Sequence, residues 1–473
     1  MGEDAPKNKT KGWIMRNISN YLDGKRNDEN KLIKSIFIKL LLLIIIFFAS
    51  ACSGSAPIVN EPNQNQNDTG TINSNIPQNE ETNNEQLIFE ISSNNIENTP
   101  TKTWKPLWQY TAQNKGSMVV KNILIESQQC LLINNPLIDY DYYQRIIPPN
   151  SFYDDIFVLK PETKQKLWQY RINSICGRNT LIQDDCIFIG TSQGPMGYDD
   201  KFFMFCINKN NGKEIWRCSI NGVTETNMVI LNKRLFFGVS GYDGNFIYCV
   251  DAQNGNMIYQ CNSPRGIVFD YKIEFISIED LLYFSDPKTS CIYSFNPNSQ
   301  QFSLVYQNPL ETFGGLAYFN KYLLFESTTQ NSFSSLCAIK LSDNKLDWVI
   351  TFKNREYNYL RKPIVKENLV YFDSYGFIAC IDMKTKQLLW SFADPVHDIQ
   401  EFILDDDRVF IGMEQEPYEA RDTEQYYRRY ILSLDANTGK VNWKMQKGVR
   451  LSCIYQDKIL LTDENNLYMI EAN

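Results

Sequence analysis

From residue 104 to residue 473, short apolar runs rich in β-branched and aromatic residues alternate with short polar turns. The clearest unit is CINKNNGKEIW (206–216), in which an apolar run leads through a polar turn with Asn-Gly into a run that ends on tryptophan. Glycine supplies the positive φ that a tight turn needs, so this pattern predicts a β-hairpin. The pattern recurs about every 45 residues, most clearly at 249–259, 380–390 and 432–443.

Two further apolar runs precede each hairpin, as in LIQDDCIFIGTS, MVILNKRLFFGVS and PIVKENLVYFDS. Each unit is therefore predicted to hold four antiparallel strands, called A, B, C and D in chain order. Four-stranded units repeated at this period are typical of the blades of a β-propeller. An aromatic residue marks each predicted D strand, and these anchors are Trp108, Trp168, Trp216, Tyr259, Tyr306, Trp348, Trp390 and Trp443.

The two ends of the repeat region complement each other. After Trp443 there are three apolar runs but no fourth, whereas residues 104–111 (WKPLWQYT) form a D strand with no A, B or C before it. We expect the first strand to complete the last blade and close the ring, which removes open sheet edges. The predicted fold is an all-β, eight-bladed propeller over residues 104–473; seven blades would require discarding the Tyr306 copy.

The region before the repeats has the pattern of an export signal. Residues 1–39 carry nine basic and five acidic side chains, and the uncharged run LLLLIIIFFASA (40–51) follows directly. A basic segment before a short apolar run is typical of a secretory signal. The run ends in small residues before Cys52, which resembles a bacterial lipoprotein signal and implies lipidation of Cys52. Alternatives are an uncleaved anchor reaching back to Ile33 and a plain cleaved signal.

Residues 52–103 are predicted to be the lipidation site followed by a disordered tether. They are dominated by Asn, Gln, Glu, Ser and Thr and offer little apolar surface to bury. A flexible tether of this length spans roughly 40 Å. The short run 87–91 (LIFEI) would suit an extra docked strand, but the favoured interpretation is that it is incidental.

The repeat pattern also indicates a family. The spacing apolar-x-Asp-x-x-Thr-Gly-Lys-x-x-Trp, best kept before Trp443, resembles the repeats of PQQ-like, eight-bladed β-propellers. Together with the lipoprotein-like signal and the polar linker, the chain is similar to the BamB-like outer-membrane assembly lipoproteins. The resemblance implies that Trp168, Trp216, Trp348, Trp390 and Trp443 are structural wedges between blades rather than ligand-stacking groups. The full structural blade motif comprises Trp108, Trp168, Trp216, Tyr259, Trp348, Trp390, Trp443 and the turn glycines Gly212, Gly255 and Gly439.

Composition disfavours several kinds of chemistry. The only histidine is His397, which argues against His-rich zinc sites and histidine-dependent catalysis, and a net charge of −8 argues against nucleic-acid binding. The fold that the resemblance implies also hosts quinone-dependent alcohol dehydrogenases, which typically stack their quinone beneath a disulfide of adjacent cysteines. No Cys-Cys pair occurs in this sequence. We expect no catalytic residues, no cofactor and no metal site, although calcium ligation stays open; Asp154-Asp155 and Asp405–Asp407 are interpreted as turns.

The cysteines fit a propeller core. Cys206, Cys249 and Cys380 occupy one equivalent place in three blades, too far apart for mutual disulfides, and are interpreted as small buried hydrophobes. One or two disulfides elsewhere stay open.

A partner-binding surface is predicted from the loops. In a four-stranded blade the B–C and D–A connections share one face, and the long insertions at 134–155, 192–201 and 413–430 all fall in B–C positions. With the D–A loop 353–362 they are rich in tyrosine, and most carry arginine, the residues enriched at binding hot spots. The candidate interface comprises Tyr142, Tyr143, Arg145, Tyr357, Tyr359, Arg361, Tyr427 and Arg428; the alternative is polar surface decoration. Strand addition to an outer D strand is a second possible mode.

These observations favour a membrane-tethered, extracytoplasmic scaffold, monomeric as a propeller, on the periplasmic face of an outer membrane or on the cell surface. Its expected partners are other envelope proteins, and the most specific hypothesis is that it binds the β-barrel assembly machinery. The alternatives are a ligand-binding or adhesion propeller and, less favoured, a quinone- or calcium-dependent dehydrogenase.

Overall fold

The computed structural model describes the chain from residue 85 onward, with gaps. The predicted signal segment, Cys52 and the tether up to residue 84 lie outside the described residues. The described residues are 85–91, 94, 96, 98–112, 119–125, 128–136, 154–172, 175–193, 202–241, 243–264, 266–270, 272–329, 333–353, 361–374, 376–394, 397–415, 428–463 and 466–473. Within them every regular element is a strand, and no helix is long and apolar enough to cross a bilayer.

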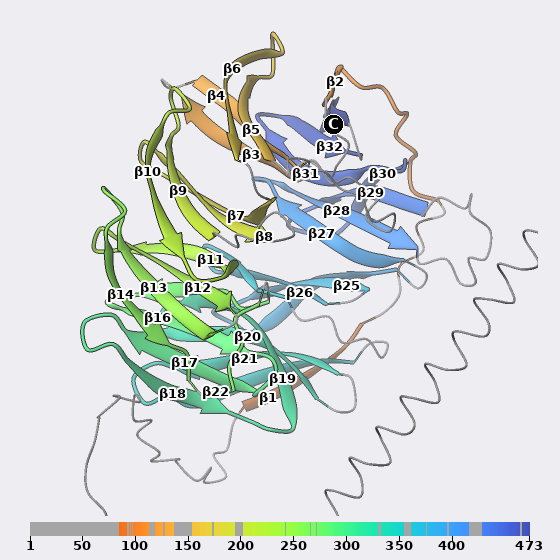
Figure 1. The fold of residues 1–473 in the computed structure, drawn as a ribbon. Coiled ribbons are helices and arrows are strands. Elements are labelled where there is room, and N and C mark those ends of the chain that lie inside the picture. Colours follow the sequence, from red (N-terminus) through yellow and green to blue (C-terminus); the bar gives the residue numbers. More distant parts are fainter. Residues whose placement is uncertain are drawn as a thin grey trace, which may run out of the picture. The chain divides into compact units, whose positions relative to one another are not determined.

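The strands form eight four-stranded antiparallel blades, as the repeat pattern predicts (Figure 1). The first four blades follow one another in chain order. Blade 1 comprises β3 (Val119–Ile125), β4 (Gln128–Pro136), β5 (Asp154–Lys160) and β6 (Gln165–Ile172); blade 2 comprises β7 (Ile175–Gln183), β8 (Cys186–Gln193), β9 (Phe202–Asn208) and β10 (Glu214–Ile220); blade 3 comprises β11 (Val223–Leu231), β12 (Arg234–Gly241), β13 (Gly244–Asp251) and β14 (Met257–Asn262); blade 4 comprises β15 (Ile276–Ile278), β16 (Leu281–Asp286), β17 (Cys291–Asn296) and β18 (Gln301–Gln307).

The last four blades repeat the plan. Blade 5 comprises β19 (Glu311–Phe319), β20 (Tyr322–Thr329), β21 (Ser334–Lys340) and β22 (Lys345–Lys353); blade 6 comprises β23 (Ile364–Lys366), β24 (Leu369–Ser374), β25 (Phe377–Asp382) and β26 (Gln387–Ala393); blade 7 comprises β27 (Asp398–Leu404), β28 (Arg408–Gln415), β29 (Arg428–Asp435) and β30 (Val441–Gln446); blade 8 comprises β31 (Arg450–Tyr455), β32 (Lys458–Thr462), β33 (Asn466–Glu471) and β2 (Trp108–Thr111). The weak fourth copy around Tyr306 is thus a full blade.

The ring closes through blade 8, which confirms the prediction from the chain ends. Strand β2 pairs antiparallel with β33, from Trp108 opposite Met469 to Thr111 opposite Asn466. One blade therefore takes its outer strand from the beginning of the repeat region and its inner three strands from the end. Detachment of β2 from β33 would therefore open this sheet.

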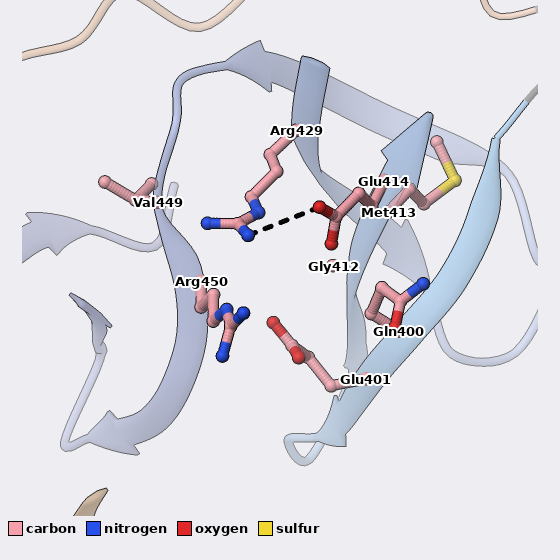
Figure 2. A pocket seen from close by; sticks show the side chains of 8 residues that line it. All are labelled: Gln400, Glu401, Gly412, Met413, Glu414, Arg429, Val449 and Arg450. Atoms are coloured by element: carbon pink, nitrogen blue, oxygen red, sulfur yellow. Dashed lines mark hydrogen bonds and ion pairs between the residues drawn. The ribbon is translucent and has the colours of Figure 1, made fainter. Parts of the chain in front are cut away.

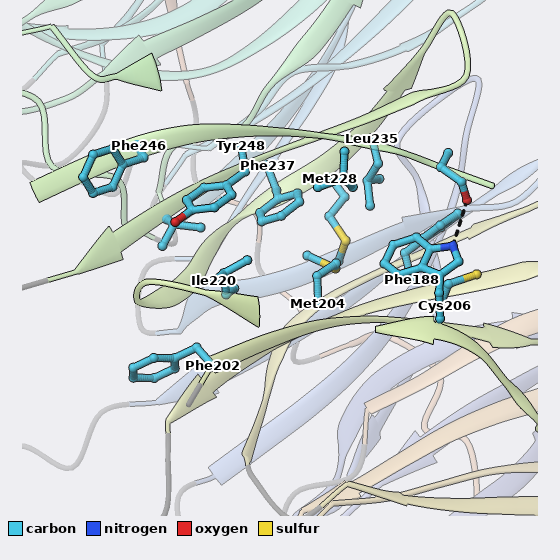
Figure 3. Close-up of a cluster of buried hydrophobic side chains, with 14 residues drawn as sticks. Phe188, Phe202, Met204, Cys206, Ile220, Met228, Leu235, Phe237, Phe246 and Tyr248 are labelled. Carbon is cyan, nitrogen blue, oxygen red and sulfur yellow. Dashed lines mark hydrogen bonds between the residues drawn. The ribbon is translucent and has the colours of Figure 1, made fainter. Parts of the chain in front are cut away.

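The core lies between the blades rather than at one centre. Eight clusters of buried apolar side chains join each blade to the next, including blade 8 to blade 1. Between blades 2 and 3, Phe188 and Met204 face Leu235 and Phe237 (Figure 3). The C strands contribute most because both of their faces are covered, as the burial of β9 and β13 illustrates.

The hairpin turns between C and D strands keep one backbone conformation throughout. The last turn residue has φ between 56° and 74° in blades 1 to 7. Glycine accepts this conformation without strain, whereas other residues adopt it less readily. Three blades have Gly212, Gly255 and Gly439 there, and the other four have Lys164, Gln300, Asn344 and Lys386.

The run at 87–91 is docked, which differs from the favoured interpretation that it is incidental. Residues Glu85–Glu90 form β1, which pairs in parallel with β22 and extends blade 5 to five strands. Leu87 and Phe89 pack against the core between blades 5 and 6. Part of the region before Trp104 therefore belongs to the propeller, because its alternate apolar side chains fit the open edge of β22. The polar composition of residues 52–103 did not reveal this.

Ten cysteine side chains are described, and all ten are free thiols. Cys206, Cys249 and Cys380 have no exposed surface and fill the same place in three blades. Burial raises the pKa of the Cys249 thiol to about 11. Such cysteines act as small apolar residues of the core.

Candidate binding face of the propeller

Most of the predicted interface residues lie outside the described part of the chain. This holds for Tyr142, Tyr143, Arg145, Tyr357, Tyr359 and Tyr427, and only the backbone of Arg428, the first residue of β29, is described. Arg361 is described, and so are the strand ends from which the loops emerge. The A strands begin, and the B strands end, on the face that carries the B–C and D–A connections. These strand ends form the base of the predicted surface.

Arg361 connects three blades at this face. It follows the D–A connection between blades 5 and 6, and its backbone N–H donates to the carboxylate of Glu326 in β20. Its guanidinium Nη1 lies 3.0 Å from Asp373 Oδ2 in β24, and its Nη2 donates to the carbonyl of Ile399 in β27 at 2.8 Å. Only 19% of the Arg361 side chain is exposed. The structure thus places this predicted interface residue in a clamp at the base of the loop.

Burial makes the two carboxyl groups beside Arg361 hard to ionise. Desolvation raises the pKa of Glu326 well above its ordinary value. Desolvation likewise raises the pKa of Asp373 to about 6, and the nearby charge of Arg361 opposes that rise. Beneath them, the hydroxyl groups of Ser334 and Ser374 lie 2.7 Å apart and join blades 5 and 6. Together these side chains form a buried polar contact between blades 5 and 6.

A small pocket of about 130 Å³ opens between blades 7 and 8 on the same face (Figure 2). Its walls come from the start of β27, the end of β28, the start of β29 and the start of β31. The pocket lies at the root of the 413–430 insertion. The lining residues are Gln400, Glu401, Gly412, Met413, Glu414, Arg429, Val449 and Arg450.

The pocket holds two carboxylates and two guanidinium groups. Glu401 Oε1 accepts a hydrogen bond from the backbone N–H of Leu451 at 2.8 Å, which joins blade 7 to blade 8. Arg429 Nη2 donates to Glu414 Oε1 at 3.3 Å. Arg450 is exposed and points toward Glu401 (Figure 2). Burial raises the pKa of Glu401, and the Leu451 N–H and the charge of Arg450 counteract this effect.

Gly412 makes room for this arrangement. A Cβ at position 412 would lie 2.6 Å from Glu401 Oε1, so a side chain there would displace the carboxylate. The balanced charges suit a polar or charged side chain of a partner better than an apolar one. Sequence reasoning missed Glu401 and Arg450, which stand singly in strands without a motif.

The blade-motif aromatics lie between neighbouring blades. Four indoles donate to the backbone of the next blade: Trp168 Nε1 to Lys209 O at 2.8 Å, Trp216 to Ala252 O at 3.1 Å, Trp390 to Ala436 O at 2.8 Å and Trp443 to Ala472 O at 3.1 Å. Tyr259 uses its hydroxyl in the same way, toward Pro297 O at 2.7 Å. Gly212, Gly255 and Gly439 each lie against the indole of the preceding blade.

Two motif tryptophans meet a lysine instead of a glycine. The ammonium of Lys386 lies 5.8 Å from the ring centre of Trp348, and Lys164 lies 5.8 Å from that of Trp108. Both lysines occupy the turn position that is glycine in other blades. A cation over an indole face is favourable, so the long lysine side chain covers the ring that the glycine backbone covers elsewhere.

The comparisons with known proteins agree on the fold. Residues 310–445 match the family model described as "Outer membrane protein assembly factor BamB". Similar solved structures include the C-terminal WD40 domain of Sif2 (TM-score 0.52, 10% identity, 78% of this chain and 99% of that one). Others are BamB from Moraxella catarrhalis (0.48, 10%, 77% and 96%) and quinohemoprotein alcohol dehydrogenase from Comamonas testosteroni (0.49, 10%, 78% and 76%).

A search of curated proteins finds no match. At such low identity the solved structures show the fold alone. The repeat pattern and the eight closed blades show that the chain is an eight-bladed β-propeller, and over residues 310–445 it is similar to the assembly factor BamB.

Proposed function

We propose that this chain is a membrane-tethered, extracytoplasmic scaffold that binds other envelope proteins and assists the assembly of outer-membrane β-barrels. The observation that carries the proposal is the match of residues 310–445 to the BamB model. This segment spans blades 5 to 7 and includes Glu326, Arg361, Asp373, Glu401 and Arg429. The matched region therefore supplies most of the candidate binding face.

The partner surface we propose is the face that carries the B–C and D–A connections. Arg361 holds the root of the 353–362 loop, and the pocket beside Glu401 lies at the root of the 413–430 insertion. Rigid strand ends beneath tyrosine- and arginine-rich loops suit protein recognition, because the scaffold limits the ordering cost of binding. Tyr357, Tyr359, Tyr427 and Arg428 would supply contacts above this base.

The test is affinity capture from solubilised envelope with the full chain as bait. Recovery of the β-barrel assembly machinery supports the proposal. Recovery of other envelope proteins alone contradicts the proposed role in β-barrel assembly. Arg450→Glu should reduce capture because it reverses an exposed charge at the pocket. Lys213→Glu is the matched control, since Lys213 is exposed in a C–D turn on the opposite face. Equal loss with both variants would contradict the choice of face.

The membrane tether is tested separately. We expect Cys52→Ser to abolish incorporation of labelled fatty acid and to release the protein from the membrane fraction. An uncleaved anchor would leave the Cys52→Ser variant in that fraction, and a plain cleaved signal would give a soluble wild-type protein. These outcomes distinguish the three interpretations of residues 1–52.

A further inference from the structure

Blade 5 differs from the other blades at its outer edge. There β1 adds a fifth strand, in register from Glu85 opposite Trp348 to Glu90 opposite Lys353 (Figure 1). The two strands run in parallel, whereas strands within each four-stranded blade pair antiparallel. The ladder continues to Ile91, whose N–H donates to Lys353 O at 3.3 Å. A strand from a distant part of the chain thus occupies the edge of β22.

Every second side chain from Leu87 to Ile91, which follows β1, packs against the propeller. Leu87, Phe89 and Ile91 are half-buried against the core between blades 5 and 6, and the rings of Phe89 and Phe352 lie 6.2 Å apart. Ile88, between them, is 52% exposed. At the beginning of the strand, Glu85 forms an ion pair with Lys386 of blade 6. The edge therefore offers main-chain pairing, apolar contacts at every second residue and a cation at one end.

The propeller does not need β1 for its closure. Blade 5 already has its four strands, and β22 is fully paired with β21 on its inner side. Trp348, the wedge residue of this blade, is 2% exposed and sits beneath Lys386. The ring itself is closed elsewhere, by β2 and β33. Only Leu87, Phe89 and Ile91 are half-buried in this segment, and its other side chains are exposed. We therefore expect β1 to detach locally more easily than the blade strands do.

We propose that the outer edge of β22 is a strand-binding surface, which residues 85–91 occupy within the chain and which a partner segment enters by displacing them. The partner is an extended segment with apolar residues at alternate positions and an acidic residue before them. It binds parallel to β22, as β1 does. This proposal does not rest on the assembly function, because it concerns an edge and not the loop face.

Covalent connection gives β1 an advantage over any free segment. A tethered strand competes at an effective concentration in the millimolar range. A separate peptide of the same sequence should therefore bind weakly to the intact protein and much more strongly once the resident strand is disabled. This difference is what the experiment measures.

The probe is a fluorescein-labelled synthetic peptide of residues 85–91, EQLIFEI, followed by fluorescence anisotropy. The double variant Leu87→Asp/Phe89→Asp of the full chain replaces the two inward-facing apolar residues that lie within β1 and keeps Ile91, which follows it. We expect it to bind the peptide at least tenfold more tightly than the wild type. Ile88→Asp is the matched control, since it adds a charge to the same strand at an exposed position and should leave the peptide affinity at the wild-type level.

Peptide variants test the side-chain pattern in the same assay. A peptide with Phe89→Asp should lose binding, and one with Ile88→Asp should keep it within about twofold. Equal affinity of the peptide for the wild type and the double variant would overturn the proposal. So would the absence of binding to the double variant while its circular dichroism shows an intact propeller.

A second route covers a double variant that fails to fold. A protease site is inserted between Ser92 and Ser93, and the protein is cleaved after folding. We expect the amino-terminal fragment to dissociate on gel filtration at a rate that rises with added peptide, and the remaining propeller to bind the peptide. Retention of the fragment at every peptide concentration would contradict the proposal.

Discussion

The indole of Trp216 in blade 2 lies against Gly255 in blade 3, and its Nε1 donates to Ala252 O of that blade at 3.1 Å. One side chain thus joins two sheets by both packing and a hydrogen bond. Trp168 with Gly212 and Trp390 with Gly439 repeat this contact. A propeller has no single central core, so its stability depends on such contacts between blades.

Gly255→Ala should lower the free energy of unfolding by about 2–4 kcal/mol. Its φ is +74°, and a Cβ would lie 2.5 Å from the Trp216 ring, so backbone strain and a clash add together. Urea denaturation followed by tryptophan fluorescence measures the change. Gly376→Ala is the control, because Gly376 has φ +89° but nothing within 4 Å of the added Cβ, so only strain applies. Equal losses in both variants would show that the contact with Trp216 contributes little.

Gln300→Gly should stabilise the protein by about 0.5–1 kcal/mol. Gln300 takes the turn position at φ 58°, which glycine adopts without strain, and its side chain is exposed. Asn344→Gly is the comparison, at φ 56° in the next blade, and should gain less because asparagine tolerates the left-handed region. Urea midpoints of the two variants decide the order, and a lower midpoint for Gln300→Gly would contradict the strain argument.

Arg361→Met should lower the free energy of unfolding by about 3–5 kcal/mol, because it leaves buried Asp373 without its cation. The Arg361–Asp373 pair has side-chain exposures of 19% and 1%. Arg217→Met removes a partner of Glu214 from a pair in which the arginine is 53% exposed, and should cost about 0–1 kcal/mol. Thermal denaturation compares them. Restoration of most of the loss by Arg361→Met/Asp373→Asn would locate the cost in the uncompensated carboxylate.

Stability should fall as the pH rises from 4 to 6. The pKa of Asp373 is about 6 in the folded protein, above its ordinary value of 3.8. Between these values the folded state holds more protons than the unfolded state, so ionisation favours unfolding. Above pH 6, ionisation of Asp373 should lower the free energy of unfolding by its full amount, about 2–3 kcal/mol.

Urea midpoints measured across this pH range test the effect of Asp373. The Asp373→Asn variant, which cannot titrate, should show a flatter profile than the wild type. Glu326→Gln should flatten it further in the same direction, because burial also raises the pKa of Glu326. A wild-type profile that rises from pH 4 to pH 6 in parallel with that of Asp373→Asn would contradict the assigned shift.

Much of the architecture follows from local patterns. The hairpin turns, the eight aromatic anchors and the unmatched D strand at residues 104–111 predict the number of blades and the closure through β2 and β33. The turns and the anchors can be recognised because each depends on residues close in sequence and recurs along the chain. The closure can be inferred because a D strand without A, B and C at one end matches a blade without D at the other. The docking of β1 was not readable in this way, since Leu87 and Phe89 meet their partners in β22 more than 250 residues later.

The sequence by itself determined the repeat, the turn conformations and the loops on which tyrosine and arginine gather. Only the tertiary structure decided that Arg361 is a clamp between blades 5, 6 and 7, and that Glu401, Glu414, Arg429 and Arg450 share one pocket. The physical reason lies in the nature of the two kinds of information. The repeat pattern reflects contacts that a residue makes within its own blade. Charged residues of different blades become neighbours only when the blades pack into the ring.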